Sequence, residues 1–301
     1  MQRLRNTLLI ILTTGLFTAC NDKKASKYTD TPSSGTINIS VDESYKPIVE
    51  QQLKVFDSSF PDAHINVHYK SETECINDFK SDSARLILIT RDLSEVEKQN
   101  LLDNKVVTHS LSIAKDAVAI IVNNNNPDST VSISELKGML TGENINNYTV
   151  VFDNQGSSTL RYMLDSIIPG EQLGKNVFAT SSNDSVIAYV ANHKNAIGVV
   201  GVSHISDFND PEGLAFINNV RVVSVLNDSL GQYYKPYQIY IAPNKYPLVR
   251  NLYYVHRETH QGLANSFARF LREYRGQLIF KSGRLFPTRV NIIFRGAEVN
   301  Q

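Results

Sequence analysis

The stretch Asp153-Asn154-Gln155-Gly156-Ser157-Ser158-Thr159 decides the fold because of what stands on either side of it. The run before it, residues 148–152, is β-branched and aromatic, which predicts a strand. Apolar residues behind it recur at helical spacing, at Leu160, Met163, Leu164, Ile167 and Ile168. The stretch is therefore expected to be a loop at the point where a strand leads into a helix.

The composition of this loop suits an anion. The first turn of a helix carries free backbone N–H groups and the positive end of the helix dipole. Gly156 lets the backbone approach a ligand closely, and Ser157, Ser158 and Thr159 add hydroxyl donors. An ordinary helix cap with a Gly-Ser turn has the same sequence, so the rest of the chain has to distinguish the two interpretations.

Composition excludes some classes of function. The chain has 301 residues, enough for one large or two ordinary domains, and its 30 basic and 30 acidic side chains cancel. This balance, without a long charged run, predicts no nucleic-acid partner. Two histidine pairs are spaced four apart, His64 with His68 and His256 with His260. Neither belongs to a metal-binding motif, so surface histidines are expected, with no metal and no cofactor.

The N-terminus has the pattern of an export signal. Arg3 and Arg5 precede an apolar run, residues 8–17, that is too short to span a bilayer, which needs ~20 apolar residues. The sequence Phe17-Thr18-Ala19-Cys20 resembles the bacterial lipoprotein box, although Phe17 departs from the usual Leu. We therefore expect residues 1–20 to be a lipoprotein signal peptide. A plain secretory peptide with an incidental cysteine is the alternative.

On the lipoprotein interpretation, Cys20 becomes the lipidated N-terminus and anchors the chain to a membrane. Residues 21–35 are polar and rich in Lys, Ser and Asp, which predicts a flexible tether. The chain has one other cysteine, Cys75, which is then left without a partner and is expected to be a buried or neutral thiol.

Three further loops are expected to join a strand to a helix. They are Asp42–Pro47 after the strand Ile37–Val41, Ser71–Glu74 after Pro61–Tyr69, and Thr90–Asp92 after Leu86–Ile89. Helix starts are marked by Pro47 and by Ser-x-x-Glu capping boxes at 71–74, 94–97 and 132–135.

The second half of the chain continues the alternation of strands and helices. Strands are expected at 117–122, 196–201, 220–226 and 237–242, and helices at 132–141 (ended by Gly142), at 184–193 and from Leu263 to about Lys281, before a last extended piece at Phe286-Pro287. This order predicts an α/β fold with largely parallel sheets. Ligands of such sheets bind beyond the carboxyl ends of the strands, where the four loops lie.

At this point the chain resembles the phosphate-binding protein family of bacterial ABC uptake transporters. The matching pieces, in order, are Ser44-Tyr45-x-Pro47, Tyr69-x-Ser71, Thr90-Arg91-Asp92-Leu93 and Gly156-Ser157-Ser158-Thr159. Structural landmarks of the family are similar to Ala196-Ile197-Gly198, Tyr246-Pro247-Leu248, Gly276-Gln277 and Gly283-Arg284-Leu285-Phe286-Pro287.

The resemblance implies a two-lobed, periplasmic-binding-protein-like (type II) clamshell with two crossing strands as its hinge. Residues 36–113 with 251–301 would form one lobe, and residues 114–250 the other. A dehydrated anion would then be bound by donors from both lobes, which is possible only when the lobes close.

The resemblance also implies the residues of the site. The expected phosphate ligands are Ser44, Tyr45, Ser71, Thr90, Arg91, Gln155, Gly156, Ser157, Ser158 and Thr159. The family often uses an acidic residue to accept the proton of hydrogen phosphate, but this sequence has Thr90-Arg91 and Gln155 at the usual positions. Asp153 is the candidate acceptor, with Glu72 as another, and the acceptor could also be absent. Arg161 is expected on the helix surface or in a lobe-closing contact.

The function implied is that of a lipid-anchored binding protein on the periplasmic side of the cell envelope. It would capture inorganic phosphate as a monomer, deliver it to the permease of an ABC transporter, and catalyse no reaction. The alternatives are a binder of another tetrahedral oxyanion, a surface or sensor lipoprotein without transport, and a serine hydrolase using Ser157 or Ser158. The hydrolase is disfavoured because Gly-Ser-Ser-Thr is not a G-x-S-x-G elbow.

Overall fold

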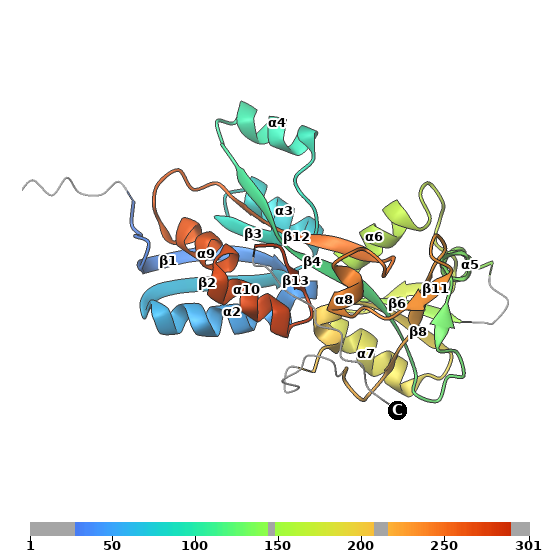
Figure 1. Ribbon diagram of the computed structural model, residues 1–301. Helices are drawn as coiled ribbons and strands as arrows, with labels where there is room; N and C mark the ends of the chain where they lie inside the picture. The colour runs from blue at the N-terminus through green and yellow to red at the C-terminus, as the bar shows by residue number, and fades with distance from the viewer. Residues whose placement is uncertain (1–27, 144–147, 208–215, 290–301) are drawn as a thin grey trace, which may run out of the picture.

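The computed structural model describes residues 28–143, 148–207 and 216–289, and these form two lobes joined by long strands (Figure 1). The predicted signal peptide and Cys20 lie outside the described residues, as do residues 21–27 of the predicted tether. Within the described part of the chain, no helix has the length and apolar character needed to cross a membrane.

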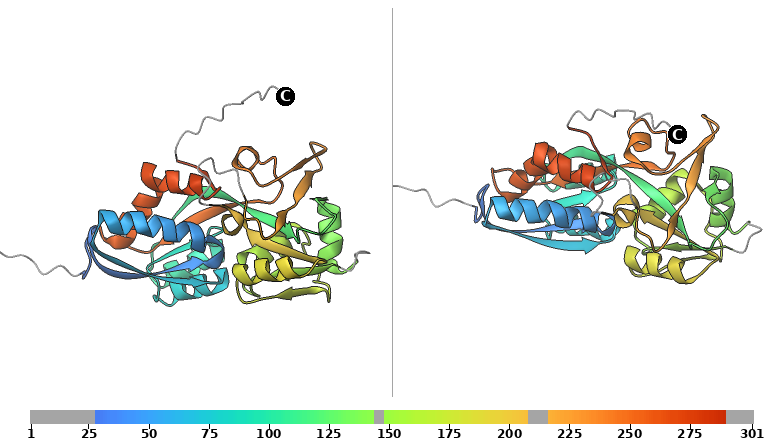
Figure 2. Two further views of the ribbon diagram at one scale, coloured as in Figure 1. Left: turned by 90° about the horizontal axis from the view of Figure 1, so that it is seen from below. Right: turned by 60° about the horizontal axis from the view of Figure 1, so that its bottom comes forward.

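The first lobe is a parallel sheet covered by helices on both faces. Its strands run in the order β2-β1-β3, and helices α2, α9 and α10 lie over one face while α3 lies over the other (Figure 2). The elements are β1 (Ser34–Asp42), η1 (Glu43–Tyr45), α2 (Lys46–Ser59), β2 (Asp62–Lys70), α3 (Glu72–Lys80), β3 (Leu86–Ile89), α4 (Glu95–Asp103), α9 (Leu263–Arg272) and α10 (Tyr274–Ser282).

The second lobe repeats this plan with strands in the order β8-β6-β7, all parallel. Its elements are α5 (Ile133–Thr141), β6 (Thr149–Phe152), α6 (Ser158–Ser166), β7 (Val177–Ala179), α7 (Asn183–Asn192), β8 (Ala196–Gly201), η2 (Val202–Ile205) and α8 (Gln238–Ile241). A small second sheet adds β5 (Thr130–Val131), β10 (Ser224–Asn227) and β11 (Gln232–Tyr234).

Two long strands connect the lobes. β4 (His109–Val122) and β12 (Val249–His256) pair with each other antiparallel, and β12 also pairs with β3. The second half of β4 pairs with β8, so that one strand runs through both lobes, with β9 (Arg221–Val222) and β13 (Phe286–Pro287) as short additions. The predicted lobe boundaries, at 113/114 and 250/251, fall inside these two strands and stay a prediction.

The predicted α/β class with mostly parallel sheets is confirmed, and β3 shows why a continuous apolar run suits it. All four of its residues are fully buried. Leu86 and Leu88 belong to the main core, whereas Ile87 and Ile89 belong to a separate cluster that includes Phe79 of α3. Because successive side chains of a strand point to opposite faces, a strand covered on both faces must be apolar throughout.

Helix boundaries follow the predicted capping residues closely. The three capping boxes form as expected, at Ser71 with Glu74, Ser94 with Glu97 and Ser132 with Glu135. Pro47 stands in the first turn of α2, and Gly142 ends α5 in the left-handed conformation with φ 79°. The prediction for Cys75 is also confirmed, because the thiol is free and buried, and burial raises its pKa.

Two sequence-based expectations are wrong. Tyr237–Ala242 is not a strand but the single helical turn α8, since a short apolar run fits either state. The long helix expected from Leu263 is two helices, because Glu273 is extended (φ −84°, ψ 169°). After the break Gly276 lies against the end of α9, where a Cβ would come 2.3 Å from the Phe270 carbonyl oxygen.

The packing of β8 predicts the effect of Gly198→Ala. A Cβ at Gly198 would lie 2.7–2.9 Å from side-chain atoms of Ile121, Val186 and Val190. These β-branched side chains cannot turn away easily, so we expect a loss of about 1–3 kcal/mol in the free energy of unfolding, measured by urea denaturation.

The matched control is Gly138→Ala in α5, where a Cβ meets nothing within 4 Å. This change should stabilise the chain by up to about 1 kcal/mol, since alanine is the better helix former. Equal stability of the two variants would contradict the packing argument.

Candidate functional site

The four predicted loops converge where the lobes meet. β1, β2 and β3 end at Asp42, Lys70 and Ile89 in the first lobe, and β6 ends at Phe152 in the second. The loop residues that follow are largely buried, among them Ser44, Tyr45, Ser71, Thr90, Ser157, Ser158 and Thr159. The carboxyl ends of the strands are therefore brought to one place, as the α/β pattern predicts.

Direct contacts join the loops across the interface between the lobes. The hydroxyl oxygens of Ser44 and Ser158 are 3.2 Å apart, and a Cβ on Gly156 would lie 3.0 Å from the Ser71 hydroxyl oxygen. Thr73 also donates to the Gly156 carbonyl oxygen at 3.4 Å. Only glycine permits this approach of the 153–159 loop to α3 without displacing its neighbours.

The N-terminus of α6 presents donors to this region. The Ser157 hydroxyl caps the helix by accepting the Leu160 N–H, and it also lies 3.0 Å from the Thr159 hydroxyl. Ser158 and Thr159 occupy the first turn, where backbone N–H groups have no acceptor within the helix and the dipole is positive. The buried end of α6 is thus suited to an anion.

A buried arginine, which the sequence analysis missed, lies beside these hydroxyls. Arg250 of β12 donates from Nε to Asp116 of β4 at 2.7 Å and from Nη1 to the Ser158 hydroxyl at 2.9 Å. Its guanidinium lies over the Tyr45 ring, 5.6 Å from the centroid. Burial acts to lower the pKa of Arg250, but the Asp116 carboxylate outweighs it and holds the arginine charged. Its Nη2 is buried and has no hydrogen-bond partner among the described residues.

Asp42, also missed, supplies the complementary acceptor. Its Oδ1 accepts the Ser44 N–H at 2.8 Å, and its Oδ2 is buried without a hydrogen-bond partner in the described part of the chain. Burial and the nearby Glu72 carboxylate raise the pKa of Asp42 to about 7, against the opposing effects of the Arg250 charge and the neighbouring Ser158 hydroxyl. Arg250 Nη2 is thus a buried donor without a partner, and Asp42 Oδ2 is a buried acceptor without one; Asp116 Oδ1 is a second such acceptor among the described residues.

The two predicted proton acceptors are already engaged. Asp153 accepts from the Thr159 hydroxyl at 2.9 Å and from the Asn183 side chain at 3.1 Å, one bond to each oxygen. Glu72 accepts from the Thr90 amide and hydroxyl with Oε1 and from Arg161 with Oε2. Unlike Asp153 and Glu72, Asp42 therefore has a carboxylate oxygen without a hydrogen-bond partner among the described residues.

Two predicted ligands do not join the buried cluster. Arg91 makes a two-pronged ion pair with Glu97, at 2.7 and 3.0 Å, within the first lobe. The side chain of Gln155 is exposed.

A third predicted ligand, Tyr45, is fully buried, and its hydroxyl donates to the Asn251 carbonyl oxygen at 3.3 Å. Its ring contributes the surface on which Arg250 rests.

A signal for the missed pair was present in the sequence. Asp116 and Arg250 each stand beside apolar runs that read as strands, residues 117–122 and 252–255. A charge inside a buried strand is rarely tolerated unless it is paired, so two such positions indicate a buried ion pair. Asp42 ends a strand as Asp153 does, and that position alone marks it as a candidate.

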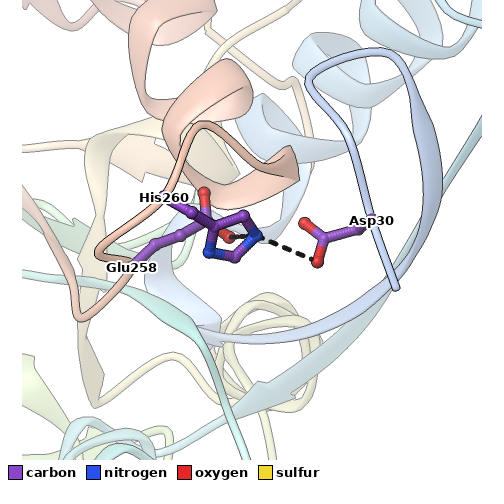
Figure 3. A group of neighbouring side chains, drawn as sticks. All are labelled: Asp30, Glu258 and His260. Carbon is purple, nitrogen blue, oxygen red and sulfur yellow. Dashed lines mark hydrogen bonds and ion pairs between the residues drawn. The ribbon is translucent and has the colours of Figure 1, made fainter. Parts of the chain in front are cut away.

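A second cluster of ionisable groups lies at the far side of the first lobe (Figure 3). Asp30, Glu258 and His260 place their ligand atoms within 4.8 Å of one another, so that they are candidates for holding a metal ion. The expectation of surface histidines is wrong for His256 and His260, since His256 is buried and His260 lies beside two carboxylates.

The bonds of this cluster argue against a metal. Arg85 Nη1 lies 2.6 Å from Asp30 and 3.2 Å from Glu258, so a guanidinium already supplies the positive charge. The remaining carboxylate oxygens accept backbone N–H groups at the start of α9, from Gly262, Leu263 and Asn265. Tyr28 stacks on His260 at 3.7 Å. The cluster is a structural tie that fixes residues 28–33 to the N-terminus of α9.

Comparison with known proteins agrees with this architecture. A family model described as the PBP superfamily domain matches residues 26–273. The phosphate-binding protein PstS 2 of Streptococcus pneumoniae is 26% identical over 120 residues, 40% of this chain, and the match spans about two fifths (39%) of the relative's length.

Two solved structures show the same fold. One is a proposed phosphate ABC transporter substrate-binding protein with bound phosphate from Clostridium perfringens, with a TM-score of 0.72, 21% identity, and coverage of 84% of this chain and 100% of that one. The other is an ABC-type phosphate transport receptor from Vibrio cholerae, with a TM-score of 0.63, 19% identity, and coverage of 83% and 99%.

The buried ion pair predicts a large cost for Arg250→Leu. Removal of the guanidinium leaves the Asp116 carboxylate buried without its countercharge, which should destabilise the chain by about 3–5 kcal/mol in urea denaturation. The double change Arg250→Leu with Asp116→Leu should recover most of this loss, because it removes both charges.

The surface variant Arg272→Leu, on an exposed position of α9, serves as the control and should change stability by no more than about 0.5 kcal/mol. A double variant that is less stable than Arg250→Leu alone would show that the ion pair is not the cause.

Proposed function

The chain belongs to the PBP superfamily, and we propose that it captures inorganic phosphate between its two lobes and delivers it to the permease of an ABC transporter. The observation that carries this proposal is the meeting of hydroxyls from both lobes beside one buried guanidinium. Ser44 comes from the first lobe, Ser158 from the second, and Arg250 from the strand between them.

The chemistry of these groups favours a tetrahedral oxyanion. Hydroxyl and backbone N–H donors that reach a charged acceptor make strong hydrogen bonds, and the start of α6 adds a favourable dipole. Arg250 Nη2 is an open donor that suits an anionic oxygen. Because the donors belong to two lobes, closing of the lobes would complete the coordination.

The charges around the site favour a ligand that carries a proton. Asp42, Asp116 and Asp153 are buried in this region, and Asp116 is paired with the Arg250 guanidinium, so a fully ionised ligand would enter a region already rich in carboxylates. The open Oδ2 of Asp42 can accept an O–H from hydrogen phosphate, which sulfate lacks. We therefore propose Asp42, in place of Asp153, as the proton acceptor.

The names of the relatives support the same ligand. The Streptococcus pneumoniae protein is a phosphate-binding protein, and the Vibrio cholerae structure is an ABC-type phosphate transport receptor. We further propose, from the lipoprotein-like sequence Phe17-Thr18-Ala19-Cys20, that the chain works outside the cytoplasm as a monomer anchored through lipid at Cys20. We propose no catalysis, since the hydroxyls of Ser157 and Ser158 bond to Thr159, Ser44 and Arg250 and to no histidine among the described residues.

Calorimetric titration of the purified chain tests the ligand. Phosphate should bind, and sulfate should bind much more weakly. Equal affinities for the two would show that the site accepts tetrahedral oxyanions in general and is not specific for phosphate.

The double change Ser157→Ala with Thr159→Ala should weaken phosphate binding by a few kcal/mol, because each hydrogen bond to a charged group is worth about 1.5–3 kcal/mol.

The control for the serine change is Ser132→Ala, which removes the N-cap of α5 in the same lobe without touching the site. It should cost about 1 kcal/mol of stability and leave phosphate affinity unchanged. A similar loss of affinity in both variants would assign the effect to the fold.

The variant Asp42→Asn tests the proton acceptor. It should weaken phosphate binding by about 10- to 100-fold, equivalent to one lost charge-assisted hydrogen bond, and leave sulfate binding unchanged or stronger. In the parent chain, sulfate binding should strengthen as the pH falls below about 7, where the Asp42 carboxyl becomes neutral and its own O–H can donate to the ligand.

This pH dependence should disappear in Asp42→Asn, because the amide does not titrate. Asp153→Asn is the comparison variant. If Asp153→Asn lost the preference for phosphate over sulfate while Asp42→Asn kept it, Asp153 and not Asp42 would be the proton acceptor.

A further inference from the structure

A network of charged and polar groups joins the lobes beside the anion site. Glu72, at the start of α3 in the first lobe, is 2% exposed, and Arg161 of α6 in the second lobe donates from Nε to its Oε2 at 2.5 Å. Arg161 Nη2 also donates to the Thr90 hydroxyl oxygen at 2.7 Å, and Thr90 in turn donates to Glu72 Oε1 at 2.6 Å. The three side chains form a closed ring of hydrogen bonds.

We propose that Glu72, Thr90 and Arg161 form a latch that stabilises the closed arrangement of the lobes by itself, without a contribution from the bound anion. The corollary, which rests on the proposed function, is that Arg161 controls how fast phosphate leaves. In the closed arrangement Arg161 is a positioning residue, which acts on the ligand through the lobes.

The latch shares no hydrogen bond with the open groups of the anion site among the described residues. Glu72, Thr90 and the Nε and Nη2 of Arg161 bond to one another, whereas the buried groups of the site without a partner among the described residues are Arg250 Nη2, Asp42 Oδ2 and Asp116 Oδ1. The hydroxyl hydrogen of Thr90, a predicted phosphate ligand, is directed to Glu72. A closed arrangement therefore has an attraction between the lobes that does not depend on filling the site.

The burial of Glu72 makes this attraction substantial. Burial acts to raise the pKa of the Glu72 carboxyl, but the Arg161 guanidinium and the Thr90 hydrogen bonds outweigh it, so the pKa is lowered and the group is charged at neutral pH. Opening the lobes removes Arg161 from this carboxylate. Arg161 itself is partly exposed, which weakens the pair by solvent screening, so the effect is smaller than for a fully buried pair.

A distance measurement between the lobes tests the latch directly. Spin labels on Asn77→Cys in α3 and Lys175→Cys in the second lobe, in a chain that carries Cys20→Ser, report the separation by electron-electron resonance, and the native thiol of Cys75 is buried and should not take up label. Without phosphate, the parent chain should contain a substantial closed population. In Arg161→Leu and in Glu72→Gln the distribution should shift to longer distances.

The matched control is Asp165→Asn. Asp165 bonds to the same guanidinium, at Nη1, but lies four residues away on α6, so this change leaves the contacts between the lobes in place. Its distance distribution should equal that of the parent. Arg161→Lys, which keeps the charge but cannot reach both Glu72 and Thr90, should lie between the parent and Arg161→Leu.

The result that overturns the latch is an identical distance distribution in the parent and in Arg161→Leu, with thermal unfolding showing both folded. If Arg161→Leu does not fold, Glu72→Gln and Arg161→Lys decide by the same measurement. Stopped-flow phosphate release should then be about 10-fold or more faster in Arg161→Leu. A parent chain that binds no phosphate would overturn the proposed function, while the distances would still decide the latch.

Discussion

The ion pair between Arg250 and Asp116 is the interaction on which the site depends. The two residues are direct register partners on β12 and β4, the strands that join the lobes. The carboxylate holds the guanidinium in a buried place where it would otherwise be too costly to keep. From this fixed position Arg250 reaches Ser158 of the second lobe and rests on Tyr45 of the first.

The buried carboxylates of the site hold hydrogen-bond donors in position as well as balancing charge. Three carboxylates, Asp42, Asp116 and Asp153, are buried in this region. Asp153 accepts a hydrogen bond on each oxygen, whereas Asp116 and Asp42 each use one oxygen and leave the other without a partner among the described residues. Asp116 fixes Arg250, and Asp153 fixes Thr159 at the start of α6. Asp42 holds the Ser44 N–H. Acidic groups in an anion site thus serve mainly to orient the donors.

The sequence predicted local structure well wherever a side chain acts on its own backbone. The capping serines at 71, 94 and 132, Pro47 and Gly142 all mark helix ends correctly, because each acts within one turn. The convergence of four loops also followed from the α/β order. The break at Glu273 and the turn α8 were missed. Both depend on packing against distant residues, and a short apolar run in the sequence does not specify that packing.

The candidate site shows the same limit. The loop residues could be found from their motifs, but the contacts between Arg161 and Glu72, and between Arg250 and Ser158, join residues about 90 positions apart. Nothing local in the sequence specifies such a pairing. Gln155 and Arg91 were chosen by their place in a motif, and their actual environments, solvent and Glu97, depend on how neighbouring segments turn.

The tie at Asp30 has a mechanical consequence. Tyr28 and Asp30 are fastened to His260, Arg85 and the first amides of α9 before the chain enters β1. Tension applied through the N-terminal end would load these bonds in shear first. It would pass into α9 and into the ends of β3 and β12 that lie beside Arg85 and Glu258, so that β1 would bear less of the pull.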